Sequence, residues 1–330
     1  MLRTRYYATL FDSAYLSRGL ALYESLKDHS SSFHLYIFAF DTITYDILRS
    51  LILDNVTVIS LKEFESPELI EVKEDRNKAE YCWTCTPSVI YYVLKRFNVN
   101  ECTYLDSDLF FYSDPSPLIS EMEGAGKKIL ITEHRFSAIP GFFELKRAGR
   151  FCVQFMTFSN EESSLKVLER WRSQCIDWCY SRYEEGKFGD QKYVEEWPGL
   201  YQNIHILQHQ GGGIAPWNIL RYSFNNSEVP LKGREKRKGS VFNVVFFHFQ
   251  YVKLLDKGFY DLGWYFIPSS VKELFYLPYL KKLKDIENML KDKLPDSRTG
   301  IMEFKIKGFK DIIKTGIKKF FRYNIIKIDY

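Results

Sequence analysis

The sequence has no long apolar run. Nowhere do about 18 to 20 consecutive apolar residues occur, the length that spans a bilayer as a helix, so a membrane-spanning segment is excluded. The opening stretch Met1-Leu2-Arg3-Thr4-Arg5 leads into a strand-like segment and shows no signal-peptide cleavage pattern. We therefore expect a cytoplasmic protein.

Cysteine is also scarce, with six residues in a chain of 330. Without a secretion signal, a chain of this length needs no disulfide framework, and we expect reduced thiols. Cys82 and Cys85 have the spacing of half a zinc site, but no second Cys-x-x-Cys and no His-x-x-His follows. The sequence thus argues against structural zinc, and it contains neither an internal repeat nor a low-complexity segment.

Apolar and aromatic residues are abundant. Hydrophobic residues make up 45% of the chain and aromatic residues 17%, including 23 Tyr and 27 Phe. This content can bury a large core, which fits one large domain or one domain with an appendage. The aromatic residues suit a densely packed core first and an extended substrate groove second.

Short apolar runs alternate with amphipathic segments along the chain. The pattern predicts strands at residues 5–12, 33–40, 56–60, 128–132 and 151–158, and helices at 15–26, 44–53, 79–97 and 161–178. Strands that alternate with helices indicate a mostly parallel sheet and an α/β fold. Later, a glycine-rich loop at 211–218 and a charged turn at 232–238 precede an aromatic strand at 241–249. We expect a catalytic domain at 1–265 and a helical extension at 266–330.

The most informative motif is Asp-x-Asp inside the apolar segment 103–111. In an extended chain Asp106 and Asp108 would point the same way while Ser107 faces away. Two carboxylates aimed together repel unless a cation joins them, and a solvated turn is the alternative explanation. Ligands of open α/β sheets gather beyond the carboxyl ends of strands, so Asp12 could face the same crevice.

Four segments occur in an order that is more specific than Asp-x-Asp alone: a first strand ending at Asp12, Tyr-Leu-Asp-Ser-Asp at 104–108, Gly-Asp-Gln at 189–191 and Phe-His-Phe at 247–249. Together they resemble family 8 glycosyltransferases, in a divergent bacterial-type branch, over about residues 5 to 255. The resemblance implies a GT-A fold and Mn²⁺, with Mg²⁺ as the alternative, held by Asp106, Asp108 and His248. Without the Asp pair, a core histidine would be the simpler interpretation of His248.

The resemblance also assigns further roles. It implies that Asp190 and Gln191 form the catalytic pair beside the anomeric carbon of the donor sugar. It places Lys253 against the diphosphate, where an ordinary surface lysine is the alternative. Asp12 and Tyr15 would contact the nucleotide base, although Asp12 could equally be a helix N-cap.

The sequence also departs from the family pattern. Phe-Cys-Val-Gln at 151–154 stands where the family has Phe-Asn-Ala-Gly, and Thr-Pro-Ser at 86–88 stands where it has an Arg. The Gly-x-x-Lys-Pro-Trp ending is missing, while Ala-Pro-Trp-Asn occurs at 215–218. These departures leave the donor sugar open and indicate a rebuilt acceptor side. Trp217 and Asn218 would contact a sugar or, more simply, anchor their loop.

The carboxyl-terminal segment 301–330 holds eight basic residues against three acidic ones. Its apolar residues Phe309, Ile312, Ile313, Ile317, Phe320 and Phe321 recur at helical spacing, with Lys307, Lys310, Lys314 and Lys318 on another face. This is typical of a basic amphipathic helix that lies on an anionic membrane surface, and packing on the catalytic domain is the alternative. Nucleic acid is not expected, because the rest of the chain is not basic.

The sequence therefore predicts a metal-dependent glycosyltransferase of polysaccharide biosynthesis, peripheral on the inner face of the membrane. It would move a hexose from a UDP-sugar to a glycan or lipid-linked glycan, with the retention that the resemblance implies. An inverting enzyme would need a base such as Glu195, Glu196 or Asp190. The alternatives are a non-catalytic glycan- or lipid-binding protein on a degenerate scaffold and a nucleotidyltransferase, which residues 10–14 disfavour because they lack a glycine-rich basic loop.

Overall fold

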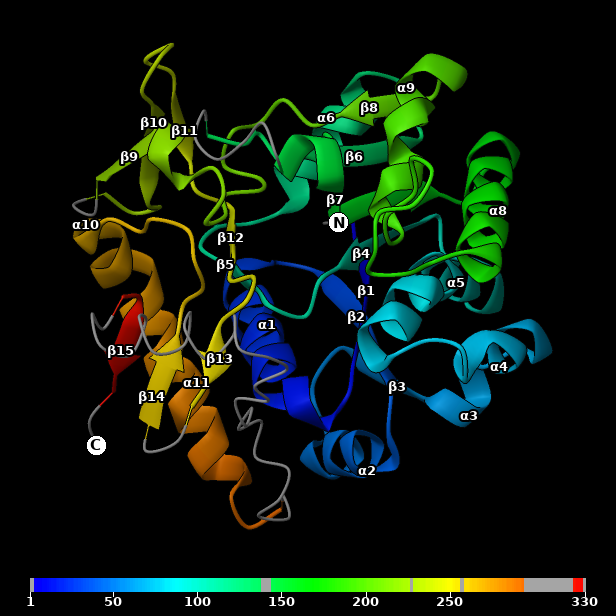
Figure 1. The fold of residues 1–330 in the computed structure, drawn as a ribbon, viewed down its shortest axis with the longest axis horizontal. Coiled ribbons are helices and arrows are strands. Elements are labelled where there is room, and N and C mark those ends of the chain that lie inside the picture. The colour runs from blue at the N-terminus through cyan, green and yellow to red at the C-terminus, as the bar shows by residue number, and fades with distance from the viewer. Residues whose placement is uncertain (1–2, 138–143, 226–227, 256–257, 294–322, 329–330) are drawn as a thin grey trace.

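The computed structural model describes residues 3–137, 144–225, 228–255, 258–293 and 323–328 (Figure 1). A seven-stranded sheet lies at its centre in the order β3-β2-β1-β4-β7-β6-β8. Its strands are β1 (Arg5–Phe11), β2 (Phe33–Ala39), β3 (Val56–Ser60), β4 (Glu101–Leu105), β6 (Ile129–Glu133), β7 (Phe151–Ser159) and β8 (Ile204–Ile206). Every neighbouring pair is parallel except the two pairs that involve β7. The predicted mixed, mostly parallel α/β sheet is confirmed.

Helices cover both faces of this sheet. They are α1 (Leu16–His29), α2 (Thr42–Leu51), α3 (Leu61–Phe64), α4 (Pro67–Lys73), α5 (Lys78–Arg96), α6 (Ser116–Gly124), α8 (Glu162–Asp177) and α9 (Trp197–Leu200). One apolar core joins α1, α2 and α6 to the sheet, and a second joins α5 and α8 to its other face. Local capping explains the helix starts: Asn77 and Glu80 form a capping box at α5, and Asp41 caps α2.

Small sheets in the second half differ from the prediction. Residues 232–238, expected as a charged turn, contain strand β10 (Lys232–Glu235), which pairs with β9 (Tyr222–Asn225) and β11 (Val241–Asn243). The prediction of a single aromatic strand at 241–249 is wrong as well. The segment divides into β11 and β12 (Phe246–His248), because Val244 and Val245 leave the first sheet and β12 pairs with β5 (Leu109–Phe111). Side-chain alternation alone cannot show that an apolar run changes its partner sheet.

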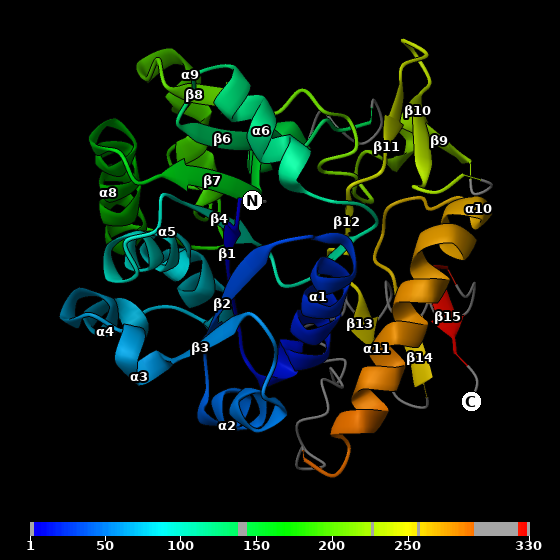
Figure 2. The ribbon, with the colours of Figure 1, turned by 180° about the vertical axis from the view of Figure 1, so that it is seen from behind.

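The chain beyond residue 265 packs against the first part of the fold. It forms α10 (Ser269–Val271), a π-helical turn (Lys272–Tyr276) and α11 (Leu277–Leu290), while β13 (Lys253–Leu254), β14 (Phe259–Asp261) and β15 (Ile325–Lys327) form a third small sheet. Helix α11 lies alongside α1 in both views (Figures 1 and 2). The domain boundary at 265 stays a prediction.

Most of the basic segment 301–330 lies outside the described residues, which include only 323–328 of it, so its predicted amphipathic helix is untested. None of the helices within the described ranges combines the length and the apolar character needed to cross a membrane.

A half-buried carboxyl group, that of Glu287, joins α11 to α1. Glu287 accepts hydrogen bonds from Ser17 Oγ at 3.2 Å and from Tyr260 Oη at 3.3 Å. Burial raises the pKa of Glu287 to about 7, against the opposing attraction of Arg18. The carboxyl group is therefore held largely protonated where an exposed glutamate would be charged.

Replacing Glu287 shows how its carboxyl group makes the free energy of unfolding depend on pH. The pKa of Glu287 is higher in the folded than in the unfolded chain, so its stabilising contribution is complete below the unfolded pKa of about 4.3 and is lost as the pH rises through about 7. We expect Glu287→Gln to gain stability relative to wild type between about pH 5 and about pH 8, measured by urea unfolding. Asp285→Asn, at an exposed position of the same helix, is the control. A pH-independent difference between Glu287→Gln and wild type would contradict this.

Candidate metal centre

The two aspartates lie on a turn between two sheets. Strand β4 ends at Leu105, the Asp106 N–H continues the ladder by donating to the Gln154 carbonyl at 3.0 Å, and Leu109 N–H donates to the Asp106 carbonyl at 3.2 Å. The extended geometry predicted for this motif is therefore wrong, although the shared direction of the carboxylates is right. The turn brings them together because β5 starts at once in a second sheet.

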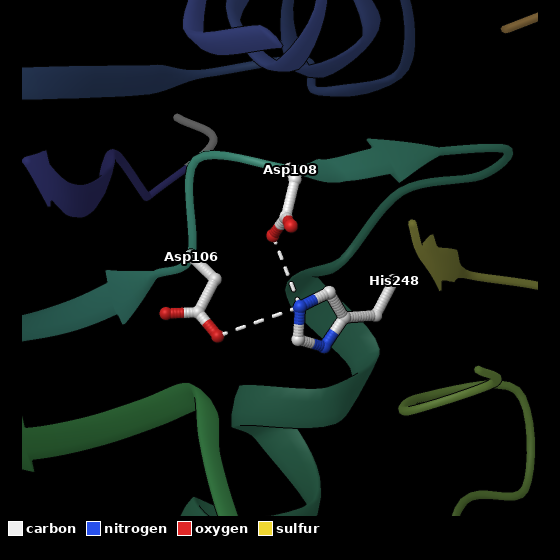
Figure 3. Close-up of side chains that lie close together, drawn as sticks. All are labelled: Asp106, Asp108 and His248. Atoms are coloured by element: carbon white, nitrogen blue, oxygen red, sulfur yellow. Dashed lines mark ion pairs between the residues drawn. The ribbon is translucent and has the colours of Figure 1, made fainter. Parts of the chain in front are cut away.

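His248 completes the cluster from a distant part of the sequence. It pairs directly with Leu109 in the register of β12 and β5, which places its ring beside the turn. Its Nε2 atom lies 3.0 Å from Asp108 Oδ1 and 3.6 Å from Asp106 Oδ2 (Figure 3). One ligand atom from each of the three residues lies within 4.8 Å of the others. The predicted ligand set is brought together by the fold.

Electrostatics within the cluster favour a cation at its centre. Burial opposes charge on His248, but attraction to Asp108 and Asp106 outweighs it and raises the pKa of the imidazole well above its ordinary value. Burial and the neighbouring Asp108 raise the pKa of Asp106 to about 6. Burial acts to raise the pKa of Asp108 as well, but the attraction and hydrogen bond of His248 lower it overall. A protonated imidazole is the positive charge that keeps these carboxylates together.

The donor set fits a hard divalent ion. Carboxylate oxygens suit Mg²⁺ and Mn²⁺, and an imidazole nitrogen suits transition-metal ions, so the mixed set can hold a divalent cation. Within the described ranges this is the one group of three or more such side chains that could hold a metal ion. Cys82 and Cys85, the half zinc site of the sequence, are free thiols and belong to no such group there.

Asp190 is close to the cluster. Its side chain is buried, and burial followed by the charge of Asp106 raises its pKa to about 8. Its carbonyl accepts a hydrogen bond from Trp171 Nε1 at 2.9 Å, which fixes the backbone at the start of a 3₁₀ turn. Gly189, just before it, has a φ of 54°, a conformation that a side chain would strain. Gln191 Nε2 donates to the Ala148 carbonyl at 2.8 Å.

Asp12 and Tyr15 lie at the end of β1 and the start of α1. Asp12 Oδ1 accepts from the Ala14 N–H at 3.1 Å, so its predicted N-cap role is confirmed, and its contact with a base stays a prediction. Burial, and to a smaller extent the charge of Asp108, raise the pKa of Tyr15. The half-buried Tyr15 ring therefore lies near the metal cluster.

Two basic residues, Lys253 and Arg18, each lie against a tyrosine ring. Lys253, predicted to contact a diphosphate, holds its ammonium group 4.4 Å from the centre of the Tyr251 ring. Arg18 was not predicted from the sequence. It is buried, and its guanidinium carbon lies 4.5 Å from the centre of the Tyr15 ring. Its guanidinium group donates a hydrogen bond to the Val252 carbonyl at 2.7 Å. A charged residue on the apolar face of α1 was the signal that could have found it.

The glycine-rich loop at 211–218 packs against His248 through Trp217. Trp217 is buried, donates from Nε1 to the His134 carbonyl at 2.8 Å, and sets its ring edge-on to His248 at 5.2 Å. Asn218 is fully buried and bonds to the His134 and Gly213 carbonyls at 2.8 Å each. Both residues anchor the loop, which confirms the simpler of their two predicted roles.

Comparison with known proteins identifies relatives. No protein-family model matches the chain. The uncharacterized protein YfnD of Bacillus subtilis (strain 168) is 29% identical over 305 residues, which are 91% of this chain and 95% of YfnD. The uncharacterized protein YfnF of the same organism is 30% identical over 229 residues, which are 67% of this chain and 75% of YfnF. The chain belongs to the YfnF family.

Solved structures define the fold of this YfnF-family chain. The galactosyltransferase LgtC, solved in complex with donor and acceptor sugar analogs, superposes with a TM-score of 0.58 at 11% identity, over 88% of this chain and all of LgtC. An LgtC variant with an active-site glutamine replaced by glutamate gives a TM-score of 0.54 at 9% identity, with the same coverage. The predicted GT-A fold is confirmed by this likeness.

Metal binding should be visible as thermal stabilisation. A ligand that binds only the folded chain stabilises it by about 2.7 kcal/mol at a concentration of 100 times its dissociation constant. We expect Mn²⁺ to raise the Tm of wild-type protein measured by differential scanning fluorimetry. Asp106→Asn and His248→Ala should remove most of the shift, because each deletes a ligand of the cluster. Asp54→Asn, which loses only an exposed ion pair with Lys27, should keep it. An equal shift in all four proteins would show that Mn²⁺ binds elsewhere.

Proposed function

We propose that this protein is a metal-dependent hexosyltransferase that uses a UDP-sugar donor, in a divergent branch of family 8 glycosyltransferases. The observation that carries the proposal is the convergence of Asp106, Asp108 and His248 at a strand end of a GT-A fold, with Asp190 beside Asp106. A site for a diphosphate-bound cation is expected at the carboxyl ends of such strands. The sugar analogs in the LgtC complex support sugar partners for this fold.

The cation is Mn²⁺ in this proposal, with Mg²⁺ as the alternative, and Asp106, Asp108 and His248 would hold it. When bound, it supplies Lewis-acid neutralisation of the negative charge on the departing diphosphate. The three side chains need little rearrangement for this, because their ligand atoms already share one small volume. A divalent cation would take the place of the Nε2 proton of His248 as the positive charge between the two carboxylates.

Asp190 and Gln191 are assigned to the donor sugar. The pKa of Asp190, raised to about 8, keeps its carboxyl group protonated at neutral pH in the metal-free protein, so it can donate a hydrogen bond to a sugar hydroxyl. In the metal-free protein a protonated Asp190 is a poor base, and Glu195 accepts a hydrogen bond from the Arg150 N–H at 2.9 Å. Retention is proposed from the family resemblance, and Glu196, which is exposed, is the base that an inverting reaction would leave to test.

The nucleotide would extend from the metal toward the start of α1. Asp12 caps the 3₁₀ turn with one carboxylate oxygen, and its other oxygen, 3.5 Å from Lys78 Nζ, is the proposed acceptor for the uracil N–H. Tyr15 would pack on the base, and Lys253 would neutralise the diphosphate. The acceptor is proposed to be a glycan or lipid-linked glycan of a surface polysaccharide.

Donor turnover tests the proposal directly. We expect wild-type protein to release UDP slowly from one sugar of a UDP-sugar panel when Mn²⁺ is present, and not with a chelator. The Asp106→Ala/Asp108→Ala double variant should lose this activity by at least about 100-fold, since it lacks two of the three metal ligands. Asp190→Asn should reduce turnover while leaving the Mn²⁺-induced Tm shift in place.

The opposite result has a defined meaning. Absence of turnover together with absence of Mn²⁺-linked binding of UDP in calorimetry would favour a non-catalytic glycan- or lipid-binding protein on a degenerate scaffold. Mn²⁺-linked UDP binding without turnover would retain the nucleotide site and reject the proposed donors.

Membrane contact is proposed separately for residues 301–330. Basic residues near an anionic surface contribute about 1 kcal/mol each, so replacing Lys307, Lys310, Lys314 and Lys318 by Gln should greatly reduce co-sedimentation with phosphatidylserine-containing vesicles. The substitutions spare Ile325–Lys327, the residues of β15 that pair with β14. Four lysine-to-glutamine changes at exposed positions elsewhere, Lys62, Lys166, Lys236 and Lys281, form the control protein. Unchanged sedimentation of the tail variant would reject the membrane role.

A further inference from the structure

The imidazole of His248 has a second polar contact on the side away from the carboxylates. Gln154 Oε1 lies 2.8 Å from His248 Nδ1, and both side chains are buried, at 0% and 5% exposure. An amide oxygen only accepts hydrogen bonds, so this 2.8 Å contact is a hydrogen bond in the tautomer that carries its proton on Nδ1. The remaining nitrogen, Nε2, is the atom that faces Asp106 and Asp108.

An irregularity in the sheet places Gln154 at this position. In the pairing of β6 with β7, Leu130 lies opposite Thr157, but Thr132 lies opposite Cys152, so β7 carries extra residues between these points. Side-chain alternation breaks there, because Phe155 packs in one core while Val153 and Met156 pack in the other. Such bulges re-aim side chains and are frequent beside active sites.

The surrounding loop is fitted to the same side chain. A Cβ atom at Gly213 would lie 3.1 Å from Gln154 Nε2, and the φ of 94° at Gly213 disfavours any other residue. The Trp217 ring packs against the His248 ring at a near-perpendicular angle. The backbone N–H of His248 donates a hydrogen bond to the Ile214 carbonyl at 2.8 Å. The ring of His248 is thereby held in one orientation.

We propose that Gln154 is a positioning residue for the metal centre: its amide oxygen holds the His248 proton on Nδ1 and so presents Nε2 to the cation. Metal-bound histidines commonly donate their other ring N–H to an acceptor, and loss of that acceptor costs about 10- to 100-fold in metal affinity. This inference rests on the proposed metal-dependent function and gives a role to Gln154, which lies in the segment 151–154 that departs from the family pattern.

The test compares Mn²⁺ affinity among matched variants, measured by the electron paramagnetic resonance signal of free Mn²⁺. Gln154→Met keeps the length of the side chain and removes the acceptor, and we expect it to weaken Mn²⁺ binding about 10- to 100-fold. Gln154→Glu keeps an acceptor and should bind at least as tightly as wild type. Thr157→Val, on the same strand, loses a buried hydrogen bond to Thr103 at 2.8 Å and should leave Mn²⁺ affinity unchanged.

A spectroscopic measurement on wild-type protein needs no variant. With Zn²⁺ as a diamagnetic probe, ¹⁵N spectra of the His248 ring should show a protonated Nδ1 and a metal-bound Nε2. A metal-bound Nδ1, equal Mn²⁺ affinity of Gln154→Met and wild type, or an equal loss in Thr157→Val would each overturn the proposal. Failure of the proposed function is a different result, because wild type itself would then neither bind Mn²⁺ nor turn over a UDP-sugar, and both proposals would fall.

Discussion

Two carboxylates whose oxygens lie close together are stabilised by a positive charge between them, and the arrangement of this site follows from that constraint. Backbone hydrogen bonds of a tight turn hold the main chain of Asp106 and Asp108 so that their carboxylates lie close to one another. In the metal-free chain the imidazolium of His248 supplies the charge. A divalent cation would replace its Nε2 proton, so metal binding and proton release are coupled in this site.

Distant parts of the sequence meet at this candidate metal centre. The turn comes from β4 and β5, the imidazole from β12, and the buried Asp190 from the turn that follows α8. Two of these belong to the small β5–β12 sheet rather than to the central sheet. The small sheet therefore contributes to the distance between Asp108 and His248, since its antiparallel register places His248 opposite Leu109, the residue after Asp108.

Much of this arrangement could be predicted from the sequence. The helix at 79–97 and the strand at 151–158 agree with α5 and β7 within a residue at each end, because long periodic segments carry strong local signals. The candidate metal ligands could be predicted because Asp-x-Asp and Phe-His-Phe occur in the order that family 8 glycosyltransferases show. The contact of Gln154 with His248 could not be found, because it depends on a bulge that is visible only in the pairing of two strands. Arg18 was missed for a related reason, since its partner, the Val252 carbonyl, is 234 residues away in sequence.

The contact between Phe249 and Tyr279 ties the candidate metal centre to the second half of the chain. The two rings stack with centroids 3.8 Å apart, and Phe249 directly follows His248 of the candidate metal centre, while Tyr279 belongs to α11. A chain that ended shortly before position 279 would still contain Asp106, Asp108 and His248, yet it would lack the helix on which the segment after His248 is stacked. The geometry of the cluster therefore depends on a helix that contributes none of its three residues.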